Sequence, residues 1–408
     1  MSGTRSWATA AVRAGLEADR QHGAVIPPLH LAANFTFEGV GARRTYDYTR
    51  SGNPTRDLVG AAIAELEEGA GAVVTASGMA AIHLVLQLVP QGGLVIAPHD
   101  GYGGTHRLLA ALHARGSLRV RFVDFGDPDA LAEALQARPF LVWIETPSNP
   151  LLRVVDIAAT AGLARAAGAL VAVDNTFLSP ALQNPLRLGA DVVVHSTTKY
   201  LNGHSDVVGG AVVARDAAVL DTLSWWLNAL GAAGAPFDAY LTLRGLRTLA
   251  VRMRAHEANA AAIAAALARD PRVRRVHYPG LPEHPGHAIA ARQQRGFGGM
   301  LSFELPEGPG AVRAFVEGLG CFSLAESLGG VESLVAHPAT MTHACMDARA
   351  RAEAGISDSL LRLSVGIEAC DDLLLDLEKA LDRVSRVVCS QSSRTGSQEG
   401  SGSKRSMA

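Results

Sequence analysis

The stretch Asp191-Val192-Val193-Val194-His195-Ser196-Thr197-Thr198-Lys199-Tyr200 changes abruptly from an apolar run to a polar turn. Three consecutive valines are typical of a strand that is buried on both faces of a sheet. In an open α/β sheet, ligands bind at the carboxyl ends of the strands, which is where Lys199 lies. Placement alone leaves two interpretations of this lysine open, a residue of a functional site and a lysine on a surface loop.

Similar short apolar runs recur through the first half of the chain and alternate with stretches of helical spacing. The further runs are Ala72–Thr75, Leu94–Ala97, Val120–Val123, Leu141–Ile144, Leu170–Val173 and Ala211–Ala214. Helical spacing is found in Met79–Leu88, Thr105–Arg115 and Val155–Ala167. This alternation predicts an α/β fold in which helices cover a parallel or mostly parallel central sheet.

The pattern along the chain divides it into four parts. We expect an N-terminal arm over 1–59, which has too little core to fold alone, and a large domain over 60–250. A helical stretch from Phe237 to Leu267, followed by strands at Met300–Leu305 and Leu361–Val365, predicts a smaller α/β domain over 251–389. Residues 390–408 are rich in Ser, Gly and basic residues, and a disordered tail is expected there.

Composition excludes several classes of protein. The net charge of −2, with both signs interspersed, gives no basic face for nucleic acid. No apolar run is long enough to cross a membrane, and the N-terminus has neither a signal-peptide nor a transit-peptide pattern, which favours a cytoplasmic protein. Four cysteines without a paired spacing, and histidines without a third partner, predict no disulfide framework and no metal site.

The basic residues are strongly biased toward arginine. Only Lys199, Lys379 and Lys404 are lysines, and the other 34 of the 37 basic residues are arginines. Arginine stays protonated and cannot act as an amine nucleophile. Lys404 lies in the predicted tail and Lys379 on the solvated face of a predicted helix, so Lys199 is the candidate for amine chemistry.

Two other predicted strand ends carry polar groups. Asp174 follows the run Leu170–Val173, where it is either a site carboxylate or a turn or cap residue. Ser77-Gly78-Met79 follows Ala72–Thr75 and opens a predicted helix, which is either a phosphate cradle or an unliganded cap.

An amine, a carboxylate and a phosphate cradle at neighbouring strand ends together meet the needs of pyridoxal phosphate. The lysine bonds to the aldehyde, the carboxylate keeps the pyridine nitrogen protonated and the helix terminus binds the phosphate. Ser196 and Thr198 add hydroxyl donors beside the lysine. The competing prediction, a dinucleotide-binding oxidoreductase, lacks the glycine fingerprint after the first strand.

Other residues have a functional and a structural interpretation. Tyr102 follows Leu94–Ala97 and could stack on the cofactor or simply occupy a loop. Tyr48 and Arg50 lie in the arm, from which they could reach the phosphate of a second subunit. Arg362 is a charge inside an apolar strand and fits either a clamp for an α-carboxylate or a structural ion pair.

Several of these segments, in this order, resemble the Cys/Met-metabolism family of pyridoxal-phosphate enzymes, and the resemblance runs from about Thr9 to Val387. They are Tyr46-Asp47-Tyr48-Thr49-Arg50-Ser51-Gly52-Asn53-Pro54-Thr55-Arg56, Ser77-Gly78-Met79, Tyr102-Gly103-Gly104, Glu145-Thr146-Pro147-Ser148-Asn149-Pro150, Val173-Asp174-Asn175-Thr176, Ser196-Thr197-Thr198-Lys199-Tyr200 and Ala325-Glu326-Ser327-Leu328-Gly329-Gly330. The resemblance implies the aspartate-aminotransferase type of fold and a homotetramer built from two active dimers.

The resemblance also implies roles for individual residues. Lys199 would be the cofactor-bonded lysine and proton carrier, Asp174 the partner of the pyridine nitrogen and Tyr102 the stacking ring. The expected phosphate ligands are Gly78, Met79, Ser196 and Thr198, with Tyr48 and Arg50 from a neighbouring subunit. Asn149, Ser327 and Arg362 would position the cofactor oxygen and the substrate carboxylate, Glu326 would lie near the distal part of the substrate, and Arg107 would bind a succinyl carboxylate.

The implied reaction is γ-replacement, in which O-succinyl-L-homoserine and L-cysteine give L-cystathionine and succinate. Segments 176–185 and 290–294 are most similar to the bacterial members that synthesise cystathionine. One position departs from them, because Ser51 stands where succinyl-using members tend to carry a second arginine, as it does in the γ-lyases. The alternative is therefore the breakdown of cystathionine to cysteine, 2-oxobutyrate and ammonia.

Overall fold

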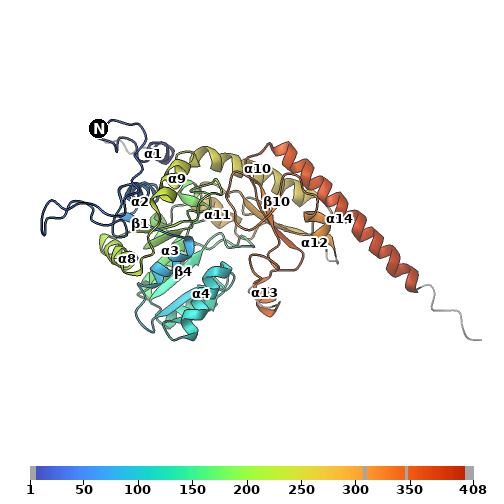
Figure 1. Cartoon of the computed structure of the whole chain (residues 1–408). Helices are drawn as coiled ribbons and strands as arrows, with labels where there is room; N and C mark the ends of the chain where they lie inside the picture. The colour runs from blue at the N-terminus through green and yellow to red at the C-terminus, as the bar shows by residue number, and fades with distance from the viewer. Residues whose placement is uncertain (1–5, 307–309, 345–347, 400–408) are drawn as a thin grey trace, which may run out of the picture.

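All seven apolar runs of the first half of the chain form strands of one sheet in the computed structural model, which describes residues 6–306, 310–344 and 348–399 (Figure 1). The order is β1-β7-β6-β5-β4-β2-β3. Strand β7 pairs antiparallel with β1 and β6, and the remaining pairs of this sheet are parallel, so the prediction of a mostly parallel sheet is confirmed. The strands are β1 (Gly71–Thr75), β2 (Leu94–Pro98), β3 (Arg119–Val123), β4 (Leu141–Glu145), β5 (Leu170–Asp174), β6 (Val192–His195) and β7 (Gly210–Ala214).

Both faces of this sheet are buried, as the unbroken valine run of β6 predicts. Val193 belongs to the core cluster on one face, whereas Val192 and Val194 belong to the cluster on the other. The first face is covered by α2 (Pro54–Glu67), α5 (Pro128–Gln136), α6 (Ile157–Ala166), α9 (Pro236–Leu246) and α10 (Leu249–Arg269). The second is covered by α3 (Gly78–Leu86), α4 (Gly103–Ala114) and α8 (Ala217–Leu230).

A second sheet of five strands follows in the C-terminal half, in the order β10-β11-β12-β9-β8. Its strands are β8 (Arg275–His277), β9 (Met300–Glu304), β10 (Ser323–Leu324), β11 (Leu334–Ala336) and β12 (Leu360–Ser364). It shares a core with α10, α12 (Ala311–Val316) and α14 (Cys370–Glu399). The remaining elements are α7 (Ser179–Leu182), the 3-10 helix η1 (Pro185–Leu188), α11 (His287–Gln293) and α13 (Ala348–Ala354).

Three boundaries differ from the sequence-based expectation. Helix α2 starts at Pro54, inside the predicted arm, because Asn53 caps it by accepting from the backbone N–H of Thr55 and Arg56. The helical stretch after Phe237 divides into α9 and α10, with Arg247 and Thr248 between them. Helix α14 continues to Glu399, into the segment predicted to be disordered, since no proline interrupts its propagation. Residues 400–408 of that segment lie outside the described residues.

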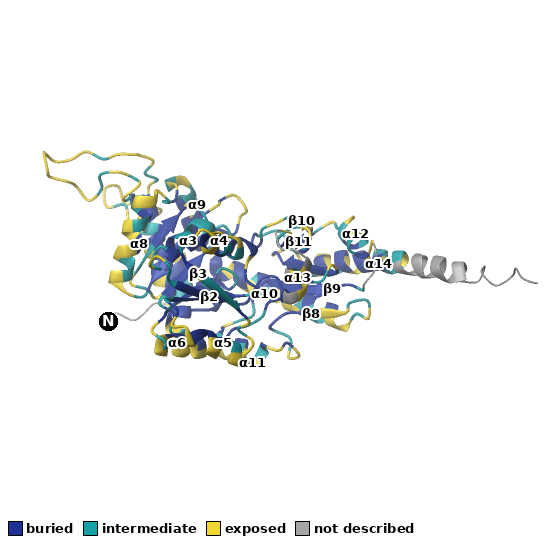
Figure 2. Cartoon of the chain, turned by 90° about the horizontal axis from the view of Figure 1, so that it is seen from below, coloured by how far each residue is buried: buried dark blue, intermediate teal, exposed yellow. Residues whose placement is uncertain are grey.

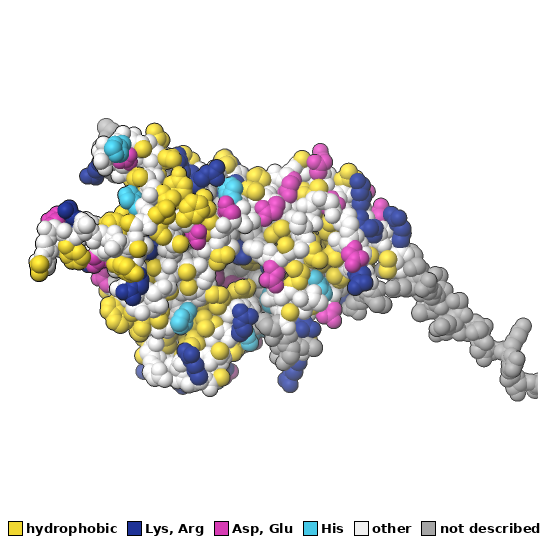
Figure 3. Space-filling view, viewed as in Figure 1, with side chains coloured by type: hydrophobic (Ala, Val, Ile, Leu, Met, Phe, Trp, Pro, Cys, Tyr) yellow, Lys and Arg dark blue, Asp and Glu magenta, His cyan; other side chains and the backbone are white. Residues whose placement is uncertain are grey.

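The arm begins with α1 (Trp7–Arg13), which packs against α2 and α10, and continues into an extended loop that projects from the large domain (Figure 1). Most of its residues are exposed (Figure 2). Large apolar side chains reach its surface, among them Val25, Leu31, Phe37 and Val40, and Figure 3 shows hydrophobic side chains gathered on this side of the molecule. No helix in the described parts of the chain combines the length and the apolar character that a membrane span requires.

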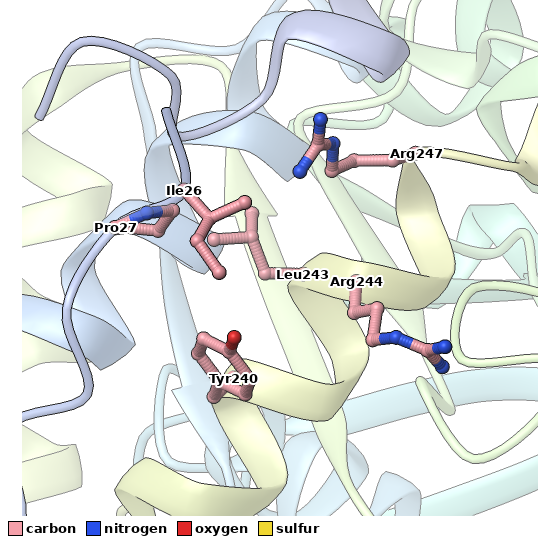
Figure 4. A pocket seen from close by; sticks show the side chains of 6 residues that line it. All are labelled: Ile26, Pro27, Tyr240, Leu243, Arg244 and Arg247. Atoms are coloured by element: carbon pink, nitrogen blue, oxygen red, sulfur yellow. The ribbon is translucent and has the colours of Figure 1, made fainter. Parts of the chain in front are cut away.

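A small cavity of about 130 Å³ lies where the arm crosses α9 (Figure 4). Ile26 and Pro27 of the arm face Tyr240 and Leu243, and the remaining lining residues are Arg244 and Arg247. The backbone carbonyl of Val12 accepts a hydrogen bond from Arg247 Nε at 3.1 Å. These contacts attach the arm to its own large domain and bring no nucleophile or carboxylate into the cavity.

Candidate active site

A cavity of about 680 Å³ lies at the carboxyl edge of the large sheet, against the small domain. Its lining includes every residue predicted for the site except Tyr48 and Arg50. The large domain contributes Gly78, Met79, Tyr102, Arg107, Asn149, Asp174, Ser196, Thr198 and Lys199, and the small domain contributes Glu326, Ser327 and Arg362. The fold therefore brings together residues that are nearly 300 positions apart in sequence.

Lys199 is mostly buried on the turn that follows β6. Its Nζ donates to Ser327 Oγ at 2.7 Å. Burial, and then the positive charge of Arg362, lower the pKa of Lys199 to about 8, although Glu326 acts in the opposite direction. An amine with this pKa can both give up and take back a proton near neutral pH.

Two carboxyl groups end neighbouring strands beneath the cavity. Asp174 and Glu145 are paired in register at the ends of β5 and β4. Asp174 Oδ1 accepts from the backbone N–H of Thr176 at 3.0 Å, and Glu145 Oε2 accepts from that of Tyr102 at 2.8 Å. Burial raises the pKa of both carboxyl groups, and the nearby charge of Asp174 raises that of Glu145 further.

Glu145 was not among the residues predicted for the site. It directly follows the buried run Leu141–Ile144, as Asp174 follows Leu170–Val173, so the same signal could have identified it. The strand pattern could not indicate the hydrogen-bond partner of Glu145. That partner is the backbone N–H of Tyr102, which comes close to Glu145 because β2 and β4 are neighbours in the sheet.

The start of α3 lines the cavity with Ser77, Gly78 and Met79. Ser77 caps the helix by accepting from the backbone N–H of Ala80 at 3.1 Å. A Cβ on Gly78 would lie 2.8 Å from Ser196 Cβ, so only glycine allows this approach of the helix to the turn after β6. The hydroxyl of Thr198, predicted to donate to a phosphate, instead donates to the carbonyl of Gly209 at 3.2 Å.

Tyr102 stands at the start of α4, with its side chain about two-fifths exposed. A Cβ on Gly104 would lie 2.5 Å from Tyr102 Cε1 and 2.8 Å from Met79 Sδ, so the absence of a side chain at Gly104 makes room for the ring. Burial, and then Glu326, raise the pKa of Tyr102. Arg107 lies on the same helix and is exposed.

Arg362 is buried in the middle of β12, with 2% of its surface exposed. Its Nη1 donates to Asn149 Oδ1 at 3.0 Å and its Nη2 to the carbonyl of Ser327 at 2.7 Å. Its Nε is buried without a hydrogen-bond partner among the described residues. Both hydrogen-bond partners of Arg362 are neutral, so no carboxylate of the protein neutralises its positive charge through these bonds. Arg362 is therefore better suited to bind the carboxylate of a substrate than to form a structural ion pair.

Tyr48 and Arg50 do not reach this cavity. Both are exposed on the arm, where Arg50 Cζ lies 5.7 Å from the centre of the Tyr48 ring. The backbone carbonyl of Arg50 accepts from Arg56 Nη2 at 3.3 Å, which ties this part of the arm to α2. Within one chain, the two residues therefore take no part in the site.

The site also contains residues that the sequence analysis did not single out. They are Ile82, Thr176, Phe177, Val208, Leu328, Met341, Thr342 and Ala344, besides Glu145 and the neighbouring glycines and proline. Most lie on turns beyond a strand end, where no periodicity marks them. The described residues contain no cluster of His, Cys, Asp and Glu that could hold a metal ion.

The donor set fits pyridoxal phosphate. A lysine of lowered pKa, the half-buried carboxyl of Asp174 and the N-terminus of α3 line one cavity. A helix N-terminus favours an anion such as a phosphate. Lys199 would bond to the aldehyde carbon, Asp174 would face the pyridine nitrogen and the Gly78–Met79 backbone would hold the phosphate.

Comparison with known proteins agrees with this chemistry. Residues 8–382 match the family model described as Cys/Met metabolism PLP-dependent enzyme. Cystathionine gamma-synthase of Escherichia coli is 59% identical over 92% of this chain and 97% of its own, and cystathionine gamma-lyase of Dictyostelium discoideum is 48% identical over 92% and 97%. A crystal structure of cystathionine gamma synthase from Xanthomonas oryzae in complex with cystathionine superposes with a TM-score of 0.93 at 62% identity, covering 94% of this chain and 99% of that one.

Proposed function

Because the chain belongs to the Cys/Met metabolism family of pyridoxal-phosphate-dependent enzymes, we propose that it catalyses γ-replacement. O-succinyl-L-homoserine and L-cysteine give L-cystathionine and succinate. The observation that carries the proposal is one cavity that combines Lys199 with two arginines, Arg107 and Arg362. O-succinyl-L-homoserine has two carboxylates, so it offers one to each guanidinium. The similarity to the synthase of Escherichia coli supports the same reaction.

The fold is that of the type I pyridoxal-phosphate enzymes, and the bound cofactor supplies an electron sink for the carbon atoms of the substrate. The protein's own groups then bind and move protons. Lys199 takes the proton from Cα and afterwards moves a proton at Cβ, so that succinate can leave from Cγ. Arg362 holds the α-carboxylate and Arg107 the succinyl carboxylate.

The remaining residue roles are part of the same proposal. With the cofactor bound, Asp174 would keep the pyridine nitrogen protonated, and the ring of Tyr102 would stack on the cofactor. Asn149 and Ser327 both accept hydrogen bonds from Arg362 and so orient its guanidinium. They would also position the cofactor oxygen. Glu326 lies near the distal part of the substrate. The phosphate is held by Gly78, Met79 and Ser196, with Thr198 turning from Gly209 to reach it.

The arm fits a role in assembly. Tyr48 and Arg50 lie outside the cavity of their own chain and on a projecting loop with exposed apolar side chains. In the proposed homotetramer of two active dimers, they complete the phosphate site of a neighbouring subunit. The division into arm, large domain, small domain and tail belongs to this proposal, as do a cytoplasmic location and a place in methionine biosynthesis by transsulfuration.

A second candidate reaction is the cleavage of cystathionine to cysteine, 2-oxobutyrate and ammonia. Ser51 favours this reaction. It directly follows Arg50, the predicted phosphate ligand, at the position where a second arginine would favour a succinyl donor. In this structure Ser51 Oγ donates to Asp47 Oδ1 at 2.6 Å, within the arm. The similarity to the lyase of Dictyostelium discoideum points the same way.

A paired assay separates the two reactions. The purified holoenzyme is incubated with O-succinyl-L-homoserine and L-cysteine, and in parallel with L-cystathionine alone. We expect cystathionine to form in the first mixture faster than 2-oxobutyrate is released in the second. Faster release of 2-oxobutyrate from cystathionine would reject the synthase in favour of the lyase.

A further inference from the structure

The segment after β11 contributes a hydroxyl group to the cavity. Met341, Thr342 and Ala344 line it, whereas His343 between them is fully buried. His343 Nδ1 lies 2.8 Å from Thr342 Oγ1, and His343 Nε2 lies 3.1 Å from the backbone carbonyl of Asn149. The buried imidazole thus connects the cavity hydroxyl of Thr342 to the loop that also binds Arg362.

These contacts determine the direction of both hydrogen bonds. A carbonyl oxygen only accepts, so His343 donates to Asn149 through Nε2. Burial, and then the charge of Arg362, lower the pKa of His343 to about 4, which leaves the ring neutral and Nδ1 without a proton. Nδ1 must then accept, and the hydroxyl of Thr342 must donate to it. The lone pairs of Thr342 Oγ1 are left for a hydrogen-bond donor in the cavity.

The donor substrate provides no such group. In O-succinyl-L-homoserine, the two carboxylates and the ester oxygens only accept hydrogen bonds, and the amino group is taken up by the cofactor. The second substrate, an amino-acid thiol, carries a free ammonium group with three donors. In the reverse or lyase direction, the same ammonium group belongs to the distal half of cystathionine.

We propose that the hydroxyl of Thr342, oriented by the buried His343, accepts a hydrogen bond from the ammonium group of the thiol substrate. Thr342 then selects an amino-acid thiol over a simple thiol. Glu326 also lines the cavity and is an acceptor when ionised, so it adds a negative charge for the same cation. This inference rests on the proposed function and names a determinant of specificity within it.

The test compares two thiols that differ in the ammonium group. L-cysteine and 3-mercaptopropionate share the thiol and the carboxylate, and the second is measured as a substrate or as a competitive inhibitor against cysteine. In T342V holoenzyme, we expect the KM for cysteine to rise about tenfold, the factor that a hydrogen bond to a charged group contributes. The KM for O-succinyl-L-homoserine and the constant for 3-mercaptopropionate should stay unchanged.

Three further variants complete the test, two of them as controls. T342S keeps the hydroxyl and should retain the KM for cysteine. Thr340 Oγ1 lies 2.8 Å from His337 Nδ1, which is the same type of pair on the same segment but outside the cavity. T340V should therefore leave every constant unchanged. H343N should raise the KM for cysteine in the same direction as T342V.

The outcomes distinguish this inference from the proposed function. If wild-type enzyme makes no cystathionine from cysteine, the proposed reaction fails. If it does, and T342V weakens both thiols equally or changes neither, the ammonium subsite is rejected. An equal loss in T340V and T342V would instead reveal a general effect on the segment and would also overturn the proposal.

Discussion

The large sheet and the small sheet supply the site in different ways. In the large domain, the chemical groups directly follow strand ends, with Asp174 after β5 and Lys199 on the turn after β6. In the small domain, Arg362 projects from the middle of β12, and Glu326 and Thr342 come from irregular segments on either side of β11. The first set is positioned by the rigid edge of a parallel sheet, and the second depends on how the two domains pack.

Hydrogen bonds across the domain boundary join the two sets. Lys199 donates to Ser327 at 2.7 Å, and Arg362 donates to Asn149 at 3.0 Å. Farther from the cavity, Ser302 Oγ donates to the carbonyl of Pro150 at 2.6 Å. In the proposed reaction, the large domain therefore provides the groups for proton transfer, whereas the small domain would orient the substrate and tune those groups.

The largest effect is expected at Lys199. Lys199→Ala should lower kcat by about 10³-fold or more, because it removes the proposed carrier of the proton at Cα. Lys199→Arg is the matched control that keeps a cation and removes the amine, and it should be as inactive. The measurement is cystathionine formation, together with the visible absorption of the lysine-bound cofactor. An active Arg variant would show that only the charge is needed.

Asp174 should come next. In Asp174→Asn, the side-chain oxygen can still accept from Thr176, but the charge is lost, so kcat should fall by about 10²-fold while the fold is retained. Glu145→Gln is the comparison at the neighbouring strand end and should cost far less, because burial already favours a neutral Glu145. Steady-state kinetics and thermal unfolding of both variants would decide, and equal losses would contradict separate roles.

Arg362 tests whether the small domain tunes the large one. In cofactor-free protein, the amine of Lys199 should lose its charge as pH rises through about 8, below the usual lysine pKa of 10.5. Arg362→Leu removes a nearby positive charge and should move this midpoint to higher pH. With only three lysines in the chain, NMR of ¹³C-methylated lysine can follow it, and Lys379 serves as internal reference. A midpoint that does not move would mean that burial alone lowers the pKa.

The smallest effect is expected at the contact between the domains that lies farther from the chemistry. Ser302→Ala removes the hydrogen bond to the carbonyl of Pro150 and should destabilise the protein by about 1 kcal/mol. Chemical denaturation measures this change. The KM for cysteine and kcat should remain at wild-type values, and a fall in kcat would place Ser302 among the groups that orient the site.

Most strands of the large sheet could be predicted because they are continuous apolar runs buried on both faces. The exception is the edge strand β3, in which Arg119 and Arg121 alternate with apolar residues. The candidate site of that domain followed, since polar residues directly after such runs must meet at one edge of a parallel sheet. Glu145 follows the same rule. The role of Thr198 as a phosphate ligand stays a prediction. In this structure its hydroxyl bonds to the backbone of Gly209, a contact that the strand pattern does not reveal.

The sequence by itself determined a mostly parallel α/β sheet, one lysine available for amine chemistry and the carboxyl and helix terminus beside it. Apolar periodicity and residue chemistry are local properties, so they can be read along the chain. Only the tertiary structure decided that Arg362 is hydrogen-bonded to Asn149 and Ser327. It also decided that Tyr48 and Arg50 lie outside the cavity of their own chain, and that His343 is hydrogen-bonded to the hydroxyl of Thr342. These depend on the packing of distant segments, which has no periodic signal in the sequence.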